Sequence, residues 1–147
     1  MSAPSDLHPT VAQELRQGGQ RYTPVRRRLV GILVEADGPL TIPEILRRSP
    51  RLAQSSVYRN LAVLERAGVV HRVVTSEEHA RYEVAEELSG HHHHHLICAS
   101  CGRVEDFVTP PRVERALART MSEVAEGAGF SPTHHRLDLV GLCDRCS

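Results

Sequence analysis

The first half of the chain places apolar residues at every third or fourth position in four segments, a period that predicts amphipathic helices. Residues typical of helix starts precede them. Thr23-Pro24 predicts an N-cap followed by proline at the first helical position, and Thr41-Ile-Pro-Glu44 predicts a capping box. Ser55 and Ser56 are expected to cap the fourth helix. The predicted helices span residues 7–16, 24–36, 41–48 and 55–67.

The pattern then changes to short runs rich in β-branched residues. Residues 69–75 and 81–84 predict two strands around a polar turn at Ser76-Glu77-Glu78. Several helices followed by a β-hairpin are the order of elements in a winged helix-turn-helix. We therefore assign residues 1–84 to a winged-helix DNA-binding domain, and residues 85–90 to a hinge.

Beyond the hinge the apolar pattern is that of a small α/β unit. Strands are expected at residues 91–98, 104–108 and 137–142, with a helix from Pro110-Pro111 to Gly127. The predicted fold class is α+β, an N-terminal winged helix-turn-helix domain plus a small C-terminal α/β dimerisation domain over residues 91–147. A unit of about 60 residues buries little core, which favours a zinc site and oligomerisation.

Composition and charge narrow the class of protein. No apolar run approaches the roughly 18 residues of a membrane span, and the N-terminus lacks the apolar core of a signal peptide, so we expect a cytoplasmic protein without a membrane partner. The net charge is zero, but residues 1–72 carry eleven arginines and six acids, and residues 86–147 carry six arginines and nine acids. This asymmetry predicts an anionic partner for the first half only.

All four cysteines fall in two Cys-x-x-Cys pairs, Cys98/Cys101 and Cys143/Cys146. Such pairs supply the four thiolates of a tetrahedral structural zinc site, the alternative being free or disulfide-bonded cysteines. Four thiolates fill the zinc shell, whereas a zinc hydrolase or deaminase needs an open position. The deaminase pattern of His-x-Glu with Pro-Cys-x-x-Cys is also absent, so we expect a protein that is not an enzyme.

Five consecutive histidines, residues 91–95, precede the first cysteine pair. A cloning tag or a solvated loop are the alternatives to a metal site, but the run is internal and adjoins the apolar Leu96-Ile97. Because side chains alternate along a strand, His93 and His95 share one face while His92 and His94 share the other, which predicts two sites. Further donors are His71, His79, Glu83, Glu86 and Glu87 on the hinge side, and Glu114 and His135 on the far side.

Histidine and carboxylate donors suit Zn2+, Fe2+, Ni2+ or Mn2+ and bind them less tightly than thiolates do. Such sites fill and empty with the metal supply, as a sensor requires. The cofactors expected are therefore a structural Zn2+ and a second divalent ion in a regulatory site.

The fourth predicted helix has the composition of a recognition helix, whose N-terminal residues meet base edges in the major groove. Arg59 can bond guanine and Tyr58 a thymine methyl group or phosphate, while Ser55 and Ser56 can bind phosphate. Arginines at the start of the second helix, including Arg21 and Arg26, can hold the DNA backbone. The alternative is a solvated helix face with one aromatic residue in the core.

Three motifs, Thr23-Pro24, Ser56-Val-Tyr-Arg59 and the run from His91 to Gly102, make the chain resemble the ferric uptake regulator family of metal-dependent bacterial transcription factors. The resemblance covers nearly the whole chain. It implies a homodimer whose winged helices bind a palindromic operator. Tyr58 matches the family's base-contacting tyrosine and Arg26 a DNA-contacting arginine.

The resemblance also implies three metal sites. The four cysteines match its structural zinc ligands, and His93 and His95 match the central ligands of its regulatory site, to which we add His71 and Glu83. The family's further site in the dimerisation domain is matched by His92, His94, Glu114 and His135.

Some positions depart from the family pattern. Pro39 stands where many members have a regulatory histidine, and His71 and Ala85 stand where the zinc-sensing branch of high-GC bacteria has an acid and a cysteine. Asp106 occupies a position where the peroxide-sensing branch has Asp. We expect a homodimeric repressor that binds double-stranded DNA when its regulatory metal is present. The alternatives are a peroxide sensor that uses Fe2+-driven histidine oxidation and a zinc-ribbon module that does not bind DNA.

Overall fold

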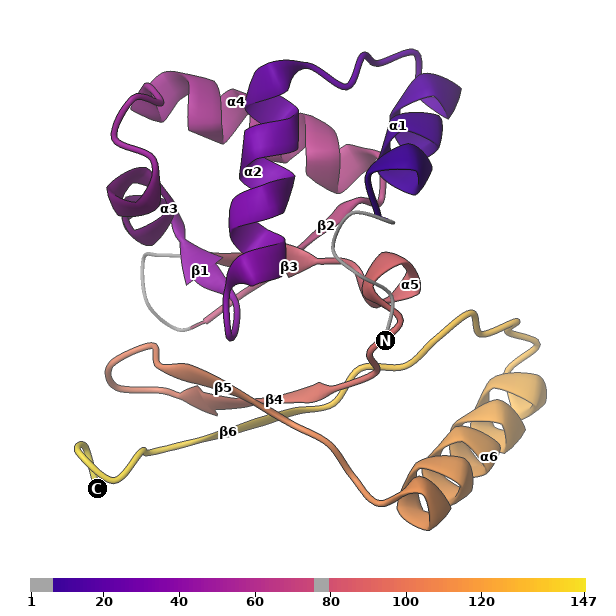
Figure 1. Ribbon diagram of the computed structural model, residues 1–147. Coiled ribbons are helices and arrows are strands. Elements are labelled where there is room, and N and C mark those ends of the chain that lie inside the picture. The colour runs from indigo at the N-terminus through magenta and orange to yellow at the C-terminus, as the bar shows by residue number, and fades with distance from the viewer. Residues whose placement is uncertain (1–6, 76–79) are drawn as a thin grey trace.

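The computed structural model describes residues 7–75 and 80–147, which form two three-stranded sheets, each with its own helices (Figure 1). The predicted turn at Ser76-Glu77-Glu78 and His79 lie outside the described residues. The elements are α1 (Leu7–Gln17), α2 (Pro24–Glu35), β1 (Leu40–Thr41), α3 (Ile42–Arg48), α4 (Gln54–Arg66), β2 (Val70–Val73), β3 (Arg81–Val84), α5 (Glu86–Ser89), β4 (His94–Cys98), β5 (Val104–Phe107), α6 (Pro111–Gly127) and β6 (Asp138–Gly141).

In the N-terminal unit, α1 to α4 lie together on one side of the sheet β1-β3-β2 (Figure 1). Apolar side chains from these helices and from β2 and β3 form one core cluster, in which Leu29, Ile45, Leu61 and Leu64 have no exposed surface. The predicted helix starts at α2 and α3 are confirmed. The Thr23 hydroxyl accepts from Arg26 N at 3.3 Å, and Thr41 and Glu44 form the complete capping box.

One prediction for this unit was wrong, and one strand was missed. Helix α4 begins at Gln54, one residue before the serines, and its N-cap is Ala53, which has no capping side chain. Ser56 lies within the first turn, where its hydroxyl accepts from Asn60 Nδ2 at 3.2 Å. Strand β1 was not predicted, because a strand of two residues carries no period in the sequence.

The C-terminal unit consists of the sheet β5-β4-β6 and the long helix α6, which lies beside the sheet (Figure 1). Strand β4 pairs antiparallel with β5 and parallel with β6. It begins at His94, later than the predicted residue 91, because the inter-strand register pairs its first residue with Phe107, the last residue of β5. The α+β fold class is confirmed by the two units.

Few apolar side chains of the C-terminal unit are covered. None of the residues of α6 is buried, and all four residues of β6 are exposed. Within the described residues no helix has both the length and the apolar character needed to cross a membrane.

The two units are joined through α5, which lies inside the predicted hinge of residues 85–90. Ala85 N donates to Val69 O at 2.9 Å, so the start of the connection is tied to the N-terminal sheet. Gly90 ends α5 with a φ of 72°, a left-handed conformation that glycine adopts without strain, and the chain then turns into the histidine run.

Candidate metal centres and nucleic-acid interface

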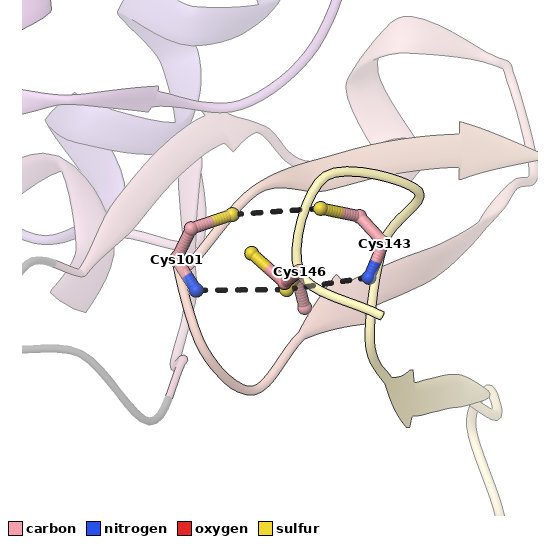
Figure 2. Close-up of side chains that lie close together, drawn as sticks. Cys101, Cys143 and Cys146 are labelled. Carbon is pink, nitrogen blue, oxygen red and sulfur yellow. Dashed lines mark hydrogen bonds between the residues drawn. The ribbon is translucent and has the colours of Figure 1, made fainter.

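The four cysteines come together at the end of the C-terminal sheet. Cys98 ends β4, Cys101 lies in the turn before β5, and Cys143 and Cys146 follow β6. Their Sγ atoms lie within 4.8 Å of one another. Figure 2 shows the side chains of Cys101, Cys143 and Cys146 turned toward one another. Cys101 Sγ lies 3.8 Å from Cys143 Sγ, and all four thiols are free. That separation far exceeds a disulfide bond of about 2.05 Å, whereas thiolates about 2.3 Å from a zinc ion lie about 3.8 Å apart in a tetrahedron.

Backbone N–H groups around Cys98 favour its thiolate form. Cys98 Sγ accepts from Cys101 N at 3.5 Å and from Cys143 N at 3.4 Å. These two N–H donors lower the pKa of the Cys98 thiol to about 6, because they stabilise its charged form. A cluster of four thiols fits Zn2+, which would cross-link the β4–β5 turn to the C-terminal end of the chain.

A second group of donors lies between the two units. Glu83 from β3 of the N-terminal sheet faces His93 and His95 of the C-terminal unit, with Glu83 Oε2 3.0 Å from His93 Nε2 and Glu83 Oε1 3.0 Å from His95 Nε2. Asp106 of β5 completes the group, 3.7 Å from His95 Nε2. Three of these four residues come from the C-terminal unit and one from the N-terminal unit.

The electrostatics of this group follow from its crowding. Burial by itself would raise the pKa of Glu83, but His95 and His93 lower it below the ordinary value. Burial would likewise lower the pKa of His93 and His95, yet Glu83 raises both. Burial and the neighbouring Glu83 raise the pKa of Asp106. Two imidazoles and two carboxylates around one point fit a divalent cation, whose charge would replace the protons that these groups otherwise share.

Two residues lie differently from the sequence-based expectation for this site. His71, a predicted ligand, pairs with Glu83 across β2 and β3 and lines the same cavity as His93 and His95, but it is not in the four-residue group. Its Nε2 is buried without a hydrogen-bond partner, and burial, with Arg136 nearby, lowers its pKa. Asp106, absent from the predicted ligands, is in the group. Its position opposite His95 in the β4–β5 register is what places it there.

The other face of the histidine run holds a third group. Glu114 of α6 faces three imidazoles: its Oε1 lies 2.7 Å from His92 Nε2, its Oε2 lies 3.0 Å from His94 Nε2, and Oε1 also contacts His135 Nε2. These are the four residues predicted for the further site. Alternation therefore divides the histidines as expected, even though regular strand pairing begins only at His94.

Glu114 stays ionised at any physiological pH. Burial would raise its pKa, but hydrogen bonds from Thr109, His94, His92 and His135 hold it at about 2. Three imidazole nitrogens and one carboxylate fit a transition-metal ion such as Zn2+.

The predicted DNA-binding residues lie at two neighbouring helix starts. Ser55, Tyr58 and Arg59 on α4 are exposed, with 52% of the Tyr58 surface open to solvent, and Val57 turns into the core. Tyr58 is thus a large aromatic side chain exposed beside an arginine on the first turns of α4. This arrangement is expected of a helix that contacts bases, whereas an aromatic residue of the core would be buried.

Arg26 has a structural role as well. Its Nε donates to Asn60 Oδ1 at 2.9 Å and its Nη1 to Arg21 O at 2.6 Å. Asn60 in turn donates to Ser56 O at 2.8 Å. Arg26 thus joins the start of α2 to α4, while Arg21 beside it is exposed.

Known proteins share this architecture. A peroxide-responsive repressor, PerR, of Staphylococcus aureus is 30% identical over 147 residues, covering 96% of this chain and 91% of its own. The ferric uptake regulator Fur of Pseudomonas aeruginosa, solved with manganese, is 26% identical with a TM-score of 0.70, covering 90% of this chain and 96% of its own. The Fur protein of Helicobacter pylori, for which three functional metal-binding sites are described, superposes with a TM-score of 0.73 at 24% identity, covering 99% of this chain and 94% of its own.

The ferric uptake regulator family model matches residues 17–140, which include α4, all residues of the two histidine and carboxylate groups, and the first cysteine pair. Proteins of this family bind DNA as dimers. The chain belongs to the ferric uptake regulator family and is a metal-dependent transcriptional regulator, not an enzyme.

Proposed function

We propose that the protein is a homodimeric repressor that binds a palindromic operator when a divalent ion occupies the group Glu83, His93, His95 and Asp106. One observation carries this proposal: the group takes a carboxylate from the N-terminal sheet and its other donors from the C-terminal unit. An ion bound there would hold the two units at one relative position. Without it, Glu83 keeps only the contacts to protonated imidazoles, which weaken as the pH rises.

The DNA-binding residues of this proposal are Arg21, Arg26, Ser55, Ser56, Tyr58 and Arg59. A dimer presents two copies of α4, and a palindrome presents two major-groove half-sites about 34 Å apart, so only some relative positions of the winged helices allow both to bind. Metal binding then favours DNA binding through the geometry of the units rather than through direct contact.

The dimer of this proposal uses the uncovered surface of the C-terminal unit. Nine of the exposed large apolar side chains of the described chain lie between residues 96 and 142, and two lie before residue 76. Val113, Leu117, Met121 and Val124 follow one another at spacings of four, four and three along α6, which places them on one face. A second copy of the chain would cover this face and the exposed strand β6.

Two metals are proposed beside the regulatory ion. Zn2+ in the four-cysteine site would be permanent and structural. The group His92, His94, Glu114 and His135 would hold a further divalent ion inside the dimerisation domain. The regulatory set Glu83, His93, His95 and Asp106 is called the hinge group below. His71 is proposed as an additional regulatory donor, since it has an unpartnered Nε2 and lines the same cavity as the hinge group.

The test is a titration of operator binding with Zn2+, Fe2+, Ni2+ and Mn2+ separately, with metal content measured in parallel. At least one ion should raise operator affinity in wild-type protein. Glu83→Gln should abolish that increase, because it removes the only donor from the N-terminal unit in the described group. Glu105→Gln is the matched control: Glu105 is exposed and pairs with Arg103, away from the histidines. Equal metal responses in the two variants would contradict the proposal.

A second candidate function, peroxide sensing, is favoured by the side chain that completes the hinge group. Asp106 rather than its neighbour Glu105 faces His93 and His95. In this function bound Fe2+ would drive oxidation of a ligand histidine. Mass spectrometry of the Fe2+-loaded protein after peroxide treatment separates the two functions, since a metal sensor gains no oxygen on His93 or His95.

A further inference from the structure

Strand β3 has two faces with different partners. Tyr82 and Val84 are buried in the core of the N-terminal unit. Arg81 and Glu83 alternate with them and point away from that core, toward the C-terminal unit. Glu83 reaches the histidines of the hinge group, while Arg81, two residues earlier, makes contacts that the proposed metal response does not use.

Arg81 joins three segments that are distant in the sequence. Its Nε donates to Gly102 O at 3.0 Å, and its Nη1 lies 3.3 Å from Pro39 O and 3.2 Å from Glu44 Oε2. Only 18% of its side-chain surface is exposed. Gly102 belongs to the turn that carries Cys98 and Cys101, so Arg81 connects the winged helix directly to the four-cysteine site.

The N-terminal end of these contacts is rigid. The same Glu44 Oε2 that accepts from Arg81 also accepts from Thr41 N at 2.8 Å, within the capping box that starts α3. The other end is fixed by the hydrogen bonds of Cys98 N to Arg103 O at 2.9 Å and of Gly102 N to Cys98 O at 3.0 Å. Arg81, Glu44 and Asp106 line one cleft between the units.

Two attachments constrain the units more than one does. If Glu83 alone connected β3 to the C-terminal unit, the winged helix could still rotate about that point and about the hinge at α5. Residues i and i+2 on one face of a strand lie about 7 Å apart, so a second contact at Arg81 removes this rotation. The two contacts therefore differ in their effect: Glu83 attaches the two units when metal is bound, and Arg81 fixes the orientation of the winged helix.

We propose that Arg81 is a positioning residue for operator binding: by bridging Pro39 and Glu44 to Gly102, it gives the metal-bound protein a single orientation of the winged helix. This inference rests on the proposed metal-dependent binding of DNA. Arginine suits the task because its planar guanidinium donates in several fixed directions, whereas a lysine ammonium on a flexible stem holds a charge without fixing the geometry.

The experiment measures orientation without DNA. Spin labels are introduced as noncanonical amino acids, which spares the cysteines, at the exposed positions Gln13 on α1 and Ser147 after the cysteine site. Labelled protein is diluted into unlabelled protein, and the label-to-label distance distribution is measured by pulsed electron resonance with and without the ion that activates wild type. Metal-loaded wild type should give a narrow distribution, and metal-loaded Arg81→Gln and Arg81→Lys a broad one.

Operator affinity and metal content complete the test. Both variants should retain the four-cysteine zinc and the hinge-site metal, while metal-loaded operator affinity falls about tenfold or more through loss of charged hydrogen bonds. Arg72→Gln is the matched control, since Arg72 lies on the adjacent strand β2 and pairs with Glu65 at its exposed surface. It should leave the distance distribution narrow.

A narrow distribution in both Arg81 variants overturns the inference, even if operator affinity falls, because Arg81 would then act by touching DNA. Loss of the hinge-site metal in both variants also overturns it, since Arg81 would then act through the ligands. If the wild-type distribution is narrow with and without metal, the proposed metal response fails, but comparison of the variants with wild type still decides the role of Arg81.

Discussion

At the scale of single residues, the histidines of the two histidine and carboxylate groups direct Nε2 toward the carboxylates of their own group. In two of these histidines, another carboxylate contacts Nδ1. Asp138 Oδ1 lies 3.2 Å from His95 Nδ1, and Glu86 Oε2 lies 2.6 Å from His92 Nδ1. A carboxylate on the far nitrogen fixes the tautomer and ring orientation of a metal-binding histidine. Both sites are therefore shaped for a metal by residues that would not touch it.

The cysteine site gives a prediction for a single buried thiol. Cys98→Ser should lose the zinc and destabilise the C-terminal unit, because Cys98 is 3% exposed and joins the end of β4 to the C-terminal cysteine pair. Zinc analysis and urea unfolding would measure the change. Ser147→Ala, at the exposed position next to Cys146, is the control. A fully folded Cys98→Ser protein without zinc would contradict a structural role for the site.

On the DNA-binding face, Tyr58→Ala and Arg59→Ala should each weaken operator binding by about 5- to 150-fold, the range of a lost base contact. Neither change should affect metal affinity, because both side chains lie on the exposed face of α4. Fluorescence anisotropy with operator and scrambled DNA tests this. A loss that is equal on both DNAs would assign these residues to backbone contacts.

At the scale of elements, the strand β4 shows what local sequence can predict. A period of two along the histidine run was enough to separate His92 and His94 from His93 and His95 and to pair Glu114 with the correct face. Capping residues likewise predicted the starts of α2 and α3.

Contacts set by the register between strands could not be predicted in the same way. Asp106 joins the hinge group because β5 pairs antiparallel with β4, and nothing within residues 101–107 specifies that register. His71 lies beside Glu83 for the same kind of reason, yet outside the four-residue group. The Arg81 contacts join residues 21 and 42 positions apart, which no local period describes.

Helix α6 yields a prediction about assembly. Leu117→Glu combined with Val124→Glu should convert the proposed dimer to monomer, because charges placed on its apolar face could not be buried against a second copy. Sedimentation velocity measures the mass. Arg119→Glu combined with Glu126→Arg, on exposed positions of the same helix, is the control. A Leu117/Val124 variant that stays dimeric would exclude this face from the interface.

At the scale of the whole molecule, the titrating groups predict how stability depends on pH when the histidine sites hold no metal and the cysteine site keeps its zinc. The pKa of Glu114 is lowered from 4.5 to about 2, so its contribution is complete above pH 4.5 and is lost as the pH falls toward 2. The pKa values of His92, His93 and His95 are raised above 6.5, so their contribution is complete below pH 6.5 and is lost as the pH rises through those values.

The free energy of unfolding should therefore be largest between about pH 4.5 and 6.5. Urea unfolding across pH 3 to 9 measures it. Glu114→Gln should flatten the acid limb and keep the part of the decline above pH 6.5 that comes from His93 and His95, whose pKa values are raised by Glu83. A wild-type protein that becomes steadily more stable from pH 6.5 to 8.5 would contradict these assignments.

In the proposed mechanism, metal binding affects DNA binding by setting the relative position of the two units. The described structure joins them through α5, Glu83 and Arg81, and two of these three connections lie on the four residues of β3. This short strand is at once part of the winged-helix sheet and a wall of the metal site. In the proposed mechanism, a change at the hinge-site ion would therefore reach α4 through this strand.

The most direct test of this account is operator affinity measured against free activating metal for wild type, His93→Ala plus His95→Ala, and His134→Ala as an exposed control histidine. We expect the double variant to keep its cysteine-bound zinc and its fold but to lose the metal-dependent rise in affinity, while the His134 variant responds as wild type does. A double variant that still binds the operator more tightly when metal is added would contradict the central claim that the hinge group reads the metal.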